Sequence, residues 1–294
     1  MTPPASRIRR SFWARLLPAA IERHSAFPRR PLLVAHRGGG ALAPENTLAA
    51  FRAAVERWEA DAVELDVHAS ADGHCVVIHD PTVERTTDGS GAVADLTLEE
   101  LRRLDAGYRF SPDGGRTFPF RAQGVRIPTF PEVLRALPDT PLVVELKTAA
   151  AQEPLRRAMR EAGCEARVCV AGERNAFVAA LADHPGPRST PREPLLRFFL
   201  LQRLGLARLW RPAAHAAHIP ETFRGVRAVT PAMVRALHER GLAVYIWTVN
   251  DPADMRRLLD WGVDGILSDR PDLLARVLHE RVGRPLPPGL AGAE

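Results

Sequence analysis

The sequence predicts an α/β fold with the architecture of a (β/α)8 TIM barrel. From Leu32 onward, short apolar segments alternate with segments of helical periodicity, which is the pattern of βα units that build a parallel sheet. The chain has 294 residues, a usual length for one such barrel. Eight segments have the apolar character of strands: 32–36, 62–68, 75–79, 141–147, 166–171, 214–219, 243–249 and 264–267.

Helical segments lie between most of the predicted strands. Asn46, Thr230 and Asp251 have residue types that cap helix N-termini, and Pro231 and Pro252 follow at first helical positions. The predicted helices cover residues 47–58, 129–136, 154–162, 176–183, 231–240, 252–261 and 272–281. Strands connected in this way run parallel, as a barrel requires.

Two segments interrupt this alternation. Residues 81–128 replace a crossover helix with a loop-rich insertion, in which a capping box of Thr97 and Glu100 predicts a helix over 96–104. An insertion at one end of a barrel usually shapes the rim of the active site. Residues 191–212 combine large apolar side chains with arginines, and they fit either a buried barrel helix or an exposed surface that contacts lipid.

The pattern divides the chain into one main domain and two terminal segments. Residues 1–30 form a basic N-terminal arm, residues 31–282 the barrel domain, and residues 283–294 a C-terminal tail. The arm contains a short amphipathic stretch that fits docking on the barrel or on a lipid surface, but it lacks the pattern of a signal peptide. No apolar run reaches transmembrane length.

The composition favours an anionic partner. The net charge is +5, and of the 40 basic residues only Lys147 is a lysine. The arginines are dispersed and are not interleaved with aromatic residues, so the sequence does not predict a nucleic-acid-binding protein. Three cysteines without metal-ligand spacing fit a reducing compartment, so we expect a cytoplasmic protein, with peripheral membrane contact as a second option.

Chemically reactive side chains concentrate on a few predicted strands. Because side chains alternate along a strand, Glu64, Asp66 and His68 share one face, and Glu145 and Lys147 share a face further along the chain. Acidic residues on one buried face are costly unless a cation or a proton neutralises them. The pattern therefore predicts a metal-assisted phosphodiesterase site at the ends of parallel strands.

Several short sequence motifs resemble those of the glycerophosphodiester phosphodiesterase family and occur in the same order as in that family. Each motif alone is weakly specific, but together they span residues 32–274 in register, which makes coincidence improbable. The resemblance implies a barrel like that of phosphatidylinositol-specific phospholipase C, with 81–128 as the insertion typical of the family. The motifs are HRG (36–38), PENT (44–47), ELDVH (64–68), HD (79–80), ELK (145–147), WTVN (247–250) and GVDGILSDRPD (262–272).

The resemblance implies that His36 and His79 transfer protons, one activating the nucleophile and the other protonating the departing alcohol. The sequence does not decide which histidine has which role. It also leaves open whether water attacks the phosphorus directly or whether a substrate hydroxyl attacks first and forms a cyclic phosphate intermediate. Arg37 and Lys147 fit the phosphate, the former as a planar fork and the latter as a point charge. Trp247 at a strand end is expected to form a pocket wall, with core packing as the alternative.

Glu64, Asp66 and Glu145 offer hard oxygen ligands for a divalent cation, either Mg²⁺ or Ca²⁺. Carboxylates alone do not distinguish these two ions. The alternative is an ion-pair cluster of the three acids with Arg37 and Lys147 and without a metal.

We therefore expect hydrolysis of a small-molecule glycerophosphodiester to an alcohol and glycerol 3-phosphate. The main variant is lysophospholipase D-type hydrolysis of lysophospholipids, with residues 195–210 and the N-terminal arm contacting a membrane surface. An alternative from another class is a membrane-associated binding protein without catalysis. We favour it less, because every catalytic position of the motif is filled. The sequence does not specify the oligomeric state.

Overall fold

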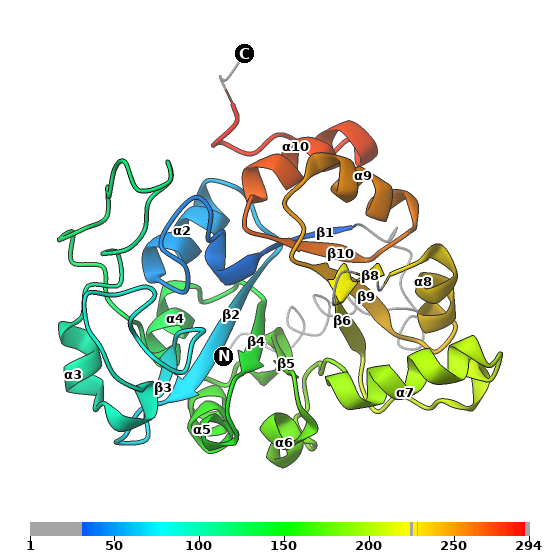
Figure 1. The fold of residues 1–294 in the computed structure, drawn as a ribbon, viewed down its shortest axis with the longest axis horizontal. Coiled ribbons are helices and arrows are strands. Elements are labelled where there is room, and N and C mark those ends of the chain that lie inside the picture. The colour runs from blue at the N-terminus through cyan, green and yellow to red at the C-terminus, as the bar shows by residue number, and fades with distance from the viewer. Residues whose placement is uncertain (1–30, 224–225, 228, 292–294) are drawn as a thin grey trace, which may run out of the picture.

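The computed structural model describes residues 31–223, 226–227 and 229–291. Seven parallel strands lie side by side in the order β5-β4-β2-β1-β10-β9-β6, with helices arranged around them (Figure 1). The strands are β1 (Leu32–Ala35), β2 (Ala62–Ala69), β4 (Leu142–Leu146), β5 (Val168–Gly172), β6 (Ala216–Pro220), β9 (Ala243–Trp247) and β10 (Gly265–Ser268). This arrangement confirms the predicted barrel class.

An eighth segment connects the two ends of this strand order. Arg188 forms a parallel bridge with Val170 of β5, and Ser189 forms a parallel bridge with Ala216 of β6. The Val170 amide donates to Pro187 and the Ser189 amide donates to Val170, both at 3.0 Å or less. Residues 188–189 therefore occupy the eighth position of the ring. The sequence analysis missed them because the surrounding segment HPGPRST has neither an apolar run nor alternation.

The predicted strand at 75–79 is not a barrel strand, which corrects one of the eight predicted strands. β3 (Cys75–Val77) pairs antiparallel with β2 and lies outside the ring. The five residues 70–74 that connect the two strands are enough for a hairpin, whereas a parallel crossover needs about a dozen. The short connection was the signal for a hairpin.

The helices mostly match their predicted ranges. Thr97 and Thr129 begin helices with complete capping boxes, and the Thr230 and Asp251 side chains accept hydrogen bonds from the first turns of their helices. The helices are α2 (Leu48–Glu56), α3 (Leu98–Arg103), α4 (Phe130–Ala136), α5 (Gln152–Ala162), α6 (Asn175–Val178), α7 (Arg192–Arg203), α8 (Pro231–His238), α9 (Pro252–Asp260) and α10 (Pro271–Val282). A short antiparallel pair, β7 (Thr222–Phe223) and β8 (Val226–Arg227), precedes α8.

One predicted cap is wrong. The N-cap of α2 is Thr47, whose hydroxyl accepts a hydrogen bond from the Ala50 amide, and not Asn46. Asn46 instead adopts a φ of 58° and turns its side chain toward the barrel. The cap and the first helical residue therefore both lie one residue later than predicted, because Asn46 is held by Asp66 of β2.

The packing leaves one region of the barrel for polar side chains. The main core lies between the strands and the helices, and includes Leu33, Phe51, Leu65 and Phe198. A second apolar cluster includes Leu32, Val34, Ala216, Ala243 and Tyr245, most of which lie toward the starts of their strands. Glu64 and Asp66 follow Val63, which pairs with Ala35 at the end of β1, and Glu145 is the next-to-last residue of β4, so the barrel positions these side chains at its C-terminal mouth.

Candidate active site

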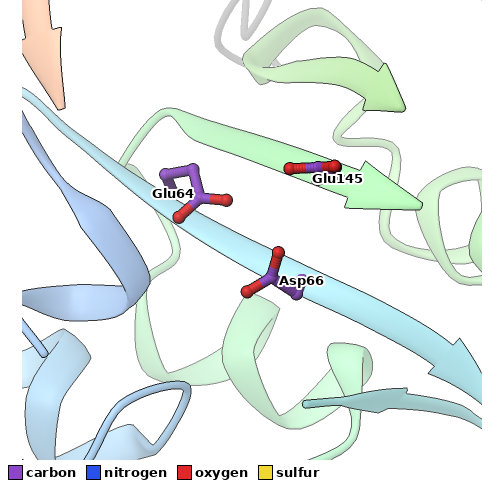
Figure 2. Close-up of side chains that lie close together, drawn as sticks. All are labelled: Glu64, Asp66 and Glu145. Carbon is purple, nitrogen blue, oxygen red and sulfur yellow. The ribbon is translucent and has the colours of Figure 1, made fainter. Parts of the chain in front are cut away.

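Three carboxylates lie together at the mouth of the barrel. Glu64 and Asp66 come from β2 and Glu145 from the neighbouring β4, where Asp66 and Glu145 are paired in the register (Figure 2). One oxygen from each residue lies within 4.8 Å of the others. Carboxylate groups at this spacing can share one hard divalent cation.

The charges of two of these carboxylates differ because their partners differ. Burial, together with the charge of Asp66, raises the pKa of Glu64 to about 7. Burial also opposes the charge of Asp66, but Lys147 and Arg37 outweigh it and hold the pKa of Asp66 below its ordinary value. Among the described residues, Glu64 has no arginine or lysine within ion-pair distance; its closest charged partner is the His36 Nε2 at 3.9 Å. This uncompensated buried acid fits a site that takes a further cation.

Asp66 is the centre of a dense polar network. Its Oδ1 lies 2.9 Å from the Lys147 Nζ, and its Oδ2 lies 3.3 Å from the Arg37 Nε. The Asn46 Nδ2 donates to Oδ2 at 2.8 Å, while the Asp66 amide donates to the Asn46 Oδ1 at 3.2 Å. Lys147 also lies 3.1 Å from the Glu145 Oε1. These contacts fix both Asp66 and the cationic groups around it.

The backbone at Arg37 has a conformation that is uncommon for a residue other than glycine. Its φ is 50°, and its amide donates to the Glu64 Oε2 at 2.9 Å. The Arg37 side chain extends to Glu45, where Nη1 donates to Oε1 at 2.9 Å. The following residue must be glycine, because a Cβ at Gly38 would lie 2.7 Å from the Phe51 ring. The turn thus directs Arg37 across the acidic cluster.

His36, directly after β1, is held by the carboxylate of Asp269, directly after β10. Its Nδ1 lies 2.7 Å from the Asp269 Oδ1, and the Asn250 Nδ2 donates to the second oxygen of Asp269 at 2.9 Å. Although burial disfavours the imidazolium, Glu64 and Asp269 outweigh it and hold the pKa of His36 above 6.5. With Nδ1 bonded to Asp269, Nε2 on the Glu64 side is the ring atom that can exchange a proton.

His79 has the same arrangement, with Asp80 as its partner. Its Nδ1 lies 2.6 Å from the Asp80 Oδ1, and its carbonyl is bonded to the His68 Nε2 at 3.1 Å. Although burial opposes the charge of Asp80, hydrogen bonds from Arg85 and His79 lower the pKa of Asp80 to about 2. Asp80 therefore stays ionised at neutral pH and orients the ring of His79.

Arg85, from the insertion, connects the two halves of this site. Its Nη1 and Nη2 donate to the two oxygens of Glu45 at 2.8 and 2.7 Å, and its Nη2 donates to the Asp80 Oδ1 at 3.2 Å. Glu45 holds Arg37, and Asp80 holds His79. The planar fork of arginine spans both carboxylates, which a lysine cannot do.

With His79 and Arg37 in the roles that the sequence predicts, replacement of Arg85 by alanine is expected to reduce turnover while both of these side chains stay chemically unchanged. Loss of position at His79 and Arg37 should lower kcat by about 10-fold to 10²-fold and leave KM nearly unchanged. Steady-state kinetics will measure this, with Arg85→Lys expected to recover little and Arg103→Ala, an exposed arginine of α3, as control. Equal kcat in Arg85→Ala and the unmodified enzyme would contradict the connection.

The structure thus brings the predicted site residues to one mouth. Trp247 lies at the end of β9 with 39% of its surface exposed, so it is not a core residue. From the sequence alone, Asp80 and Asp269 are expected to orient loops rather than to bind a metal, and neither Arg85 nor Asn250 is singled out as a site residue. The adjacency of His79 and Asp80 was a usable signal, whereas Asp269 lies 233 residues from His36 and required the fold.

Comparisons with known proteins agree with this geometry. The model of the glycerophosphoryl diester phosphodiesterase family matches residues 36–184 and 187–273. A glycerophosphodiester phosphodiesterase of Caldanaerobacter subterraneus is 36% identical over 85% of this chain and 99% of its own length. One from Bacillus subtilis is 30% identical, covering 91% of this chain and 93% of its own.

Solved structures show the same fold. The glycerophosphoryl diester phosphodiesterase domain of a Mycobacterium tuberculosis protein has a TM-score of 0.76 and 25% identity, covering 86% of this chain and all of that domain. A phosphodiesterase of Oleispira antarctica, solved with its product sn-glycerol-3-phosphate, has a TM-score of 0.66 and 23% identity over 85% of this chain and 97% of its own. The barrel, its carboxylate-lined mouth and these matches together establish that the chain is an enzyme of the glycerophosphoryl diester phosphodiesterase family.

Proposed function

We propose that the enzyme hydrolyses water-soluble glycerophosphodiesters, such as glycerophosphocholine, to an alcohol and glycerol 3-phosphate. One observation carries the proposal: two histidines, each bonded through Nδ1 to a carboxylate, lie around a cluster of three acids at the barrel mouth. The product matches the one named for the Oleispira phosphodiesterase.

A divalent cation, Mg²⁺ or Ca²⁺, is part of this proposal. Glu64, Asp66 and Glu145 would hold it, and the raised pKa of Glu64 is consistent with a buried carboxylate that has no arginine or lysine within ion-pair distance among the described residues. When bound, such an ion neutralises charge on the phosphate oxygens. The alternative, an ion-pair cluster without a metal, keeps the contacts of Asp66 and Glu145 but leaves the buried Glu64 without a cation.

The residues of the chain then divide the reaction between them. Arg37 and Lys147 bind the phosphate, because both are charged and lie on the acidic cluster beside the histidines. One histidine takes a proton from the attacking water or hydroxyl at its Nε2, and the other donates a proton from its Nε2 to the departing alkoxide. Asp269 and Asp80 hold the two rings in position throughout.

The test is a direct assay of glycerophosphocholine with ³¹P nuclear magnetic resonance. We expect glycerol 3-phosphate and choline in the presence of Mg²⁺ or Ca²⁺, and no product after chelation. Phosphocholine as the phosphorus product would mean that the other ester bond breaks. No hydrolysis with either ion would contradict the proposal.

A second substrate class has a structural observation in its favour. Leucines on α7 and the segment after it are exposed, and Trp247 at the mouth is also exposed. We propose lysophospholipids as the second class, since an acyl chain needs an apolar surface near the mouth. The comparison is turnover of lysophosphatidylcholine against glycerophosphocholine, before and after Trp247→Ser. An equal loss of turnover on both substrates would mean that Trp247 contacts the part that the two substrates have in common. That result would contradict a contact with the acyl chain.

A further inference from the structure

The outer side of α7 carries an unusual surface. Leu196, Leu200 and Leu204 lie four residues apart and therefore form one row along the helix. They are 48%, 61% and 62% exposed, in contrast to the nearly buried Leu195 and Phe198 on the inner side. Leu206 and Leu209, 37% and 63% exposed, follow in the segment after the helix. We call these five leucines the α7 row.

The helix is anchored firmly enough that this exposure is not a sign of poor packing. Phe198 contacts the ring of the buried Trp210 with a centroid distance of 4.9 Å. Arg240, after α8, donates to the Arg208 carbonyl at 3.2 Å. Figure 1 shows α7 at the periphery, with no other described element over its outer side. The α7 row is thus a fixed surface that no described residue covers.

Arginines flank the α7 row. Helical geometry places Arg197 on one side of the leucines and Arg203 on the other, about 100° and 20° from Leu196. Arg208 and Arg211 follow in the next segment, and all four arginines are exposed. None of the four makes an ion pair with a described residue, whereas Arg102 and Arg256 elsewhere on the surface pair with acids. No acidic residue occurs from 194 to 220.

We propose that the α7 row docks the enzyme on a lipid surface rich in anionic headgroups. A helix that lies in the membrane plane typically inserts leucines into the interface, while its flanking arginines reach the lipid headgroups. The first residue of α7 follows Ser189 by three positions, so the helix that carries the row begins at the same end of the barrel as the carboxylates. No helix among the described residues is long and apolar enough to cross a membrane. Docking does not require the proposed reaction.

Charge distinguishes this partner from two other candidates. A second copy of the chain would bring the same arginines face to face. The N-terminal arm, residues 1–30, carries seven arginines and one glutamate, so it too would place like charges together. An anionic polymer without apolar groups would leave the leucines in water. Anionic lipid satisfies both the leucines and the arginines.

The test is flotation of the full chain with vesicles of phosphatidylglycerol and phosphatidylcholine in equal parts, against phosphatidylcholine alone. We expect binding to the mixed vesicles and weak binding to the neutral ones. Loss of three arginines should lower the partition coefficient by about 10²-fold, since each adds to the attraction near an anionic surface. The variants are Leu196→Ser with Leu200→Ser and Leu204→Ser, and Arg197→Gln with Arg203→Gln and Arg208→Gln.

The matched control is Val282→Ser with Leu286→Ser, which removes two exposed apolar side chains far along the chain from α7. The control should bind vesicles like the unmodified enzyme, and all variants should hydrolyse glycerophosphocholine at the same rate. Absence of vesicle binding by the unmodified enzyme would overturn the proposal, as would full binding by the leucine variant, which would assign binding to the N-terminal arm. A dimer in sedimentation that the leucine variant abolishes would assign the row to a second copy and also overturn it.

Discussion

Replacement of either His36 or His79 by alanine is expected to lower kcat for glycerophosphocholine by a factor of about 10² to 10⁴, because each removes one proton transfer. Folding should be little affected, since each histidine is bonded mainly to one carboxylate that keeps other partners. Steady-state kinetics and circular dichroism will check the two expectations together. Near-normal turnover in either variant would contradict the two-histidine assignment.

A substrate with a better leaving group separates the two roles. A p-nitrophenyl diester releases a phenolate that needs no proton, so loss of the general acid should matter little with this substrate. The variant that recovers on the p-nitrophenyl diester has lost the acid, and the variant that stays slow has lost the base. Equal recovery of both variants would contradict a division into acid and base.

Glu64→Gln is expected to lower the affinity for Mg²⁺ or Ca²⁺ by roughly 10²-fold, as for other disrupted metal sites. Because Glu64 has no arginine or lysine within ion-pair distance among the described residues, its neutral isostere leaves no arginine or lysine without an acid. The metal-free variant should therefore unfold at the same temperature as the unmodified enzyme, or at a higher one. Activity should return partly at high cation concentration.

Calorimetry and thermal unfolding measure this difference. A cation at about 100 times its Kd stabilises the unmodified enzyme by about 2.7 kcal/mol, and the same concentration should stabilise the variant far less. Glu153→Gln, an exposed acid on α5, is the control and should respond like the unmodified enzyme. An equal cation-dependent rise in Tm for Glu64→Gln would remove Glu64 from the site.

The predictable part of this molecule is the part that local sequence determines. The alternation of apolar strands and capped helices predicted the barrel, and the two-residue period on β2 predicted that Glu64 and Asp66 point the same way. Residues 188–189 were missed because they have no apolar run of their own. Bridges to the neighbouring strands β5 and β6 are enough to hold so short a segment in the barrel. Their place is determined by closure of the ring.

The supporting residues were harder to predict because they act across long sequence distances. Asn46 has a residue type suited to a helix cap, and only its contact with Asp66, 20 residues away, shows otherwise. Arg85 looks like one of many surface arginines until Glu45 and Asp80 are seen on either side of it. The exposure of the α7 row likewise depends on which side of the helix meets Trp210.

The two histidines are positioned by different parts of the fold. His36 directly follows β1, so the end of that ring strand determines its position. His79 lies between the β2–β3 hairpin and the insertion of residues 81–128, which carries Arg85. Residues 81–128 supply Arg85 but none of the three clustered carboxylates, so a change in the length of this insertion would leave the strands that carry Glu64, Asp66 and Glu145 as they are.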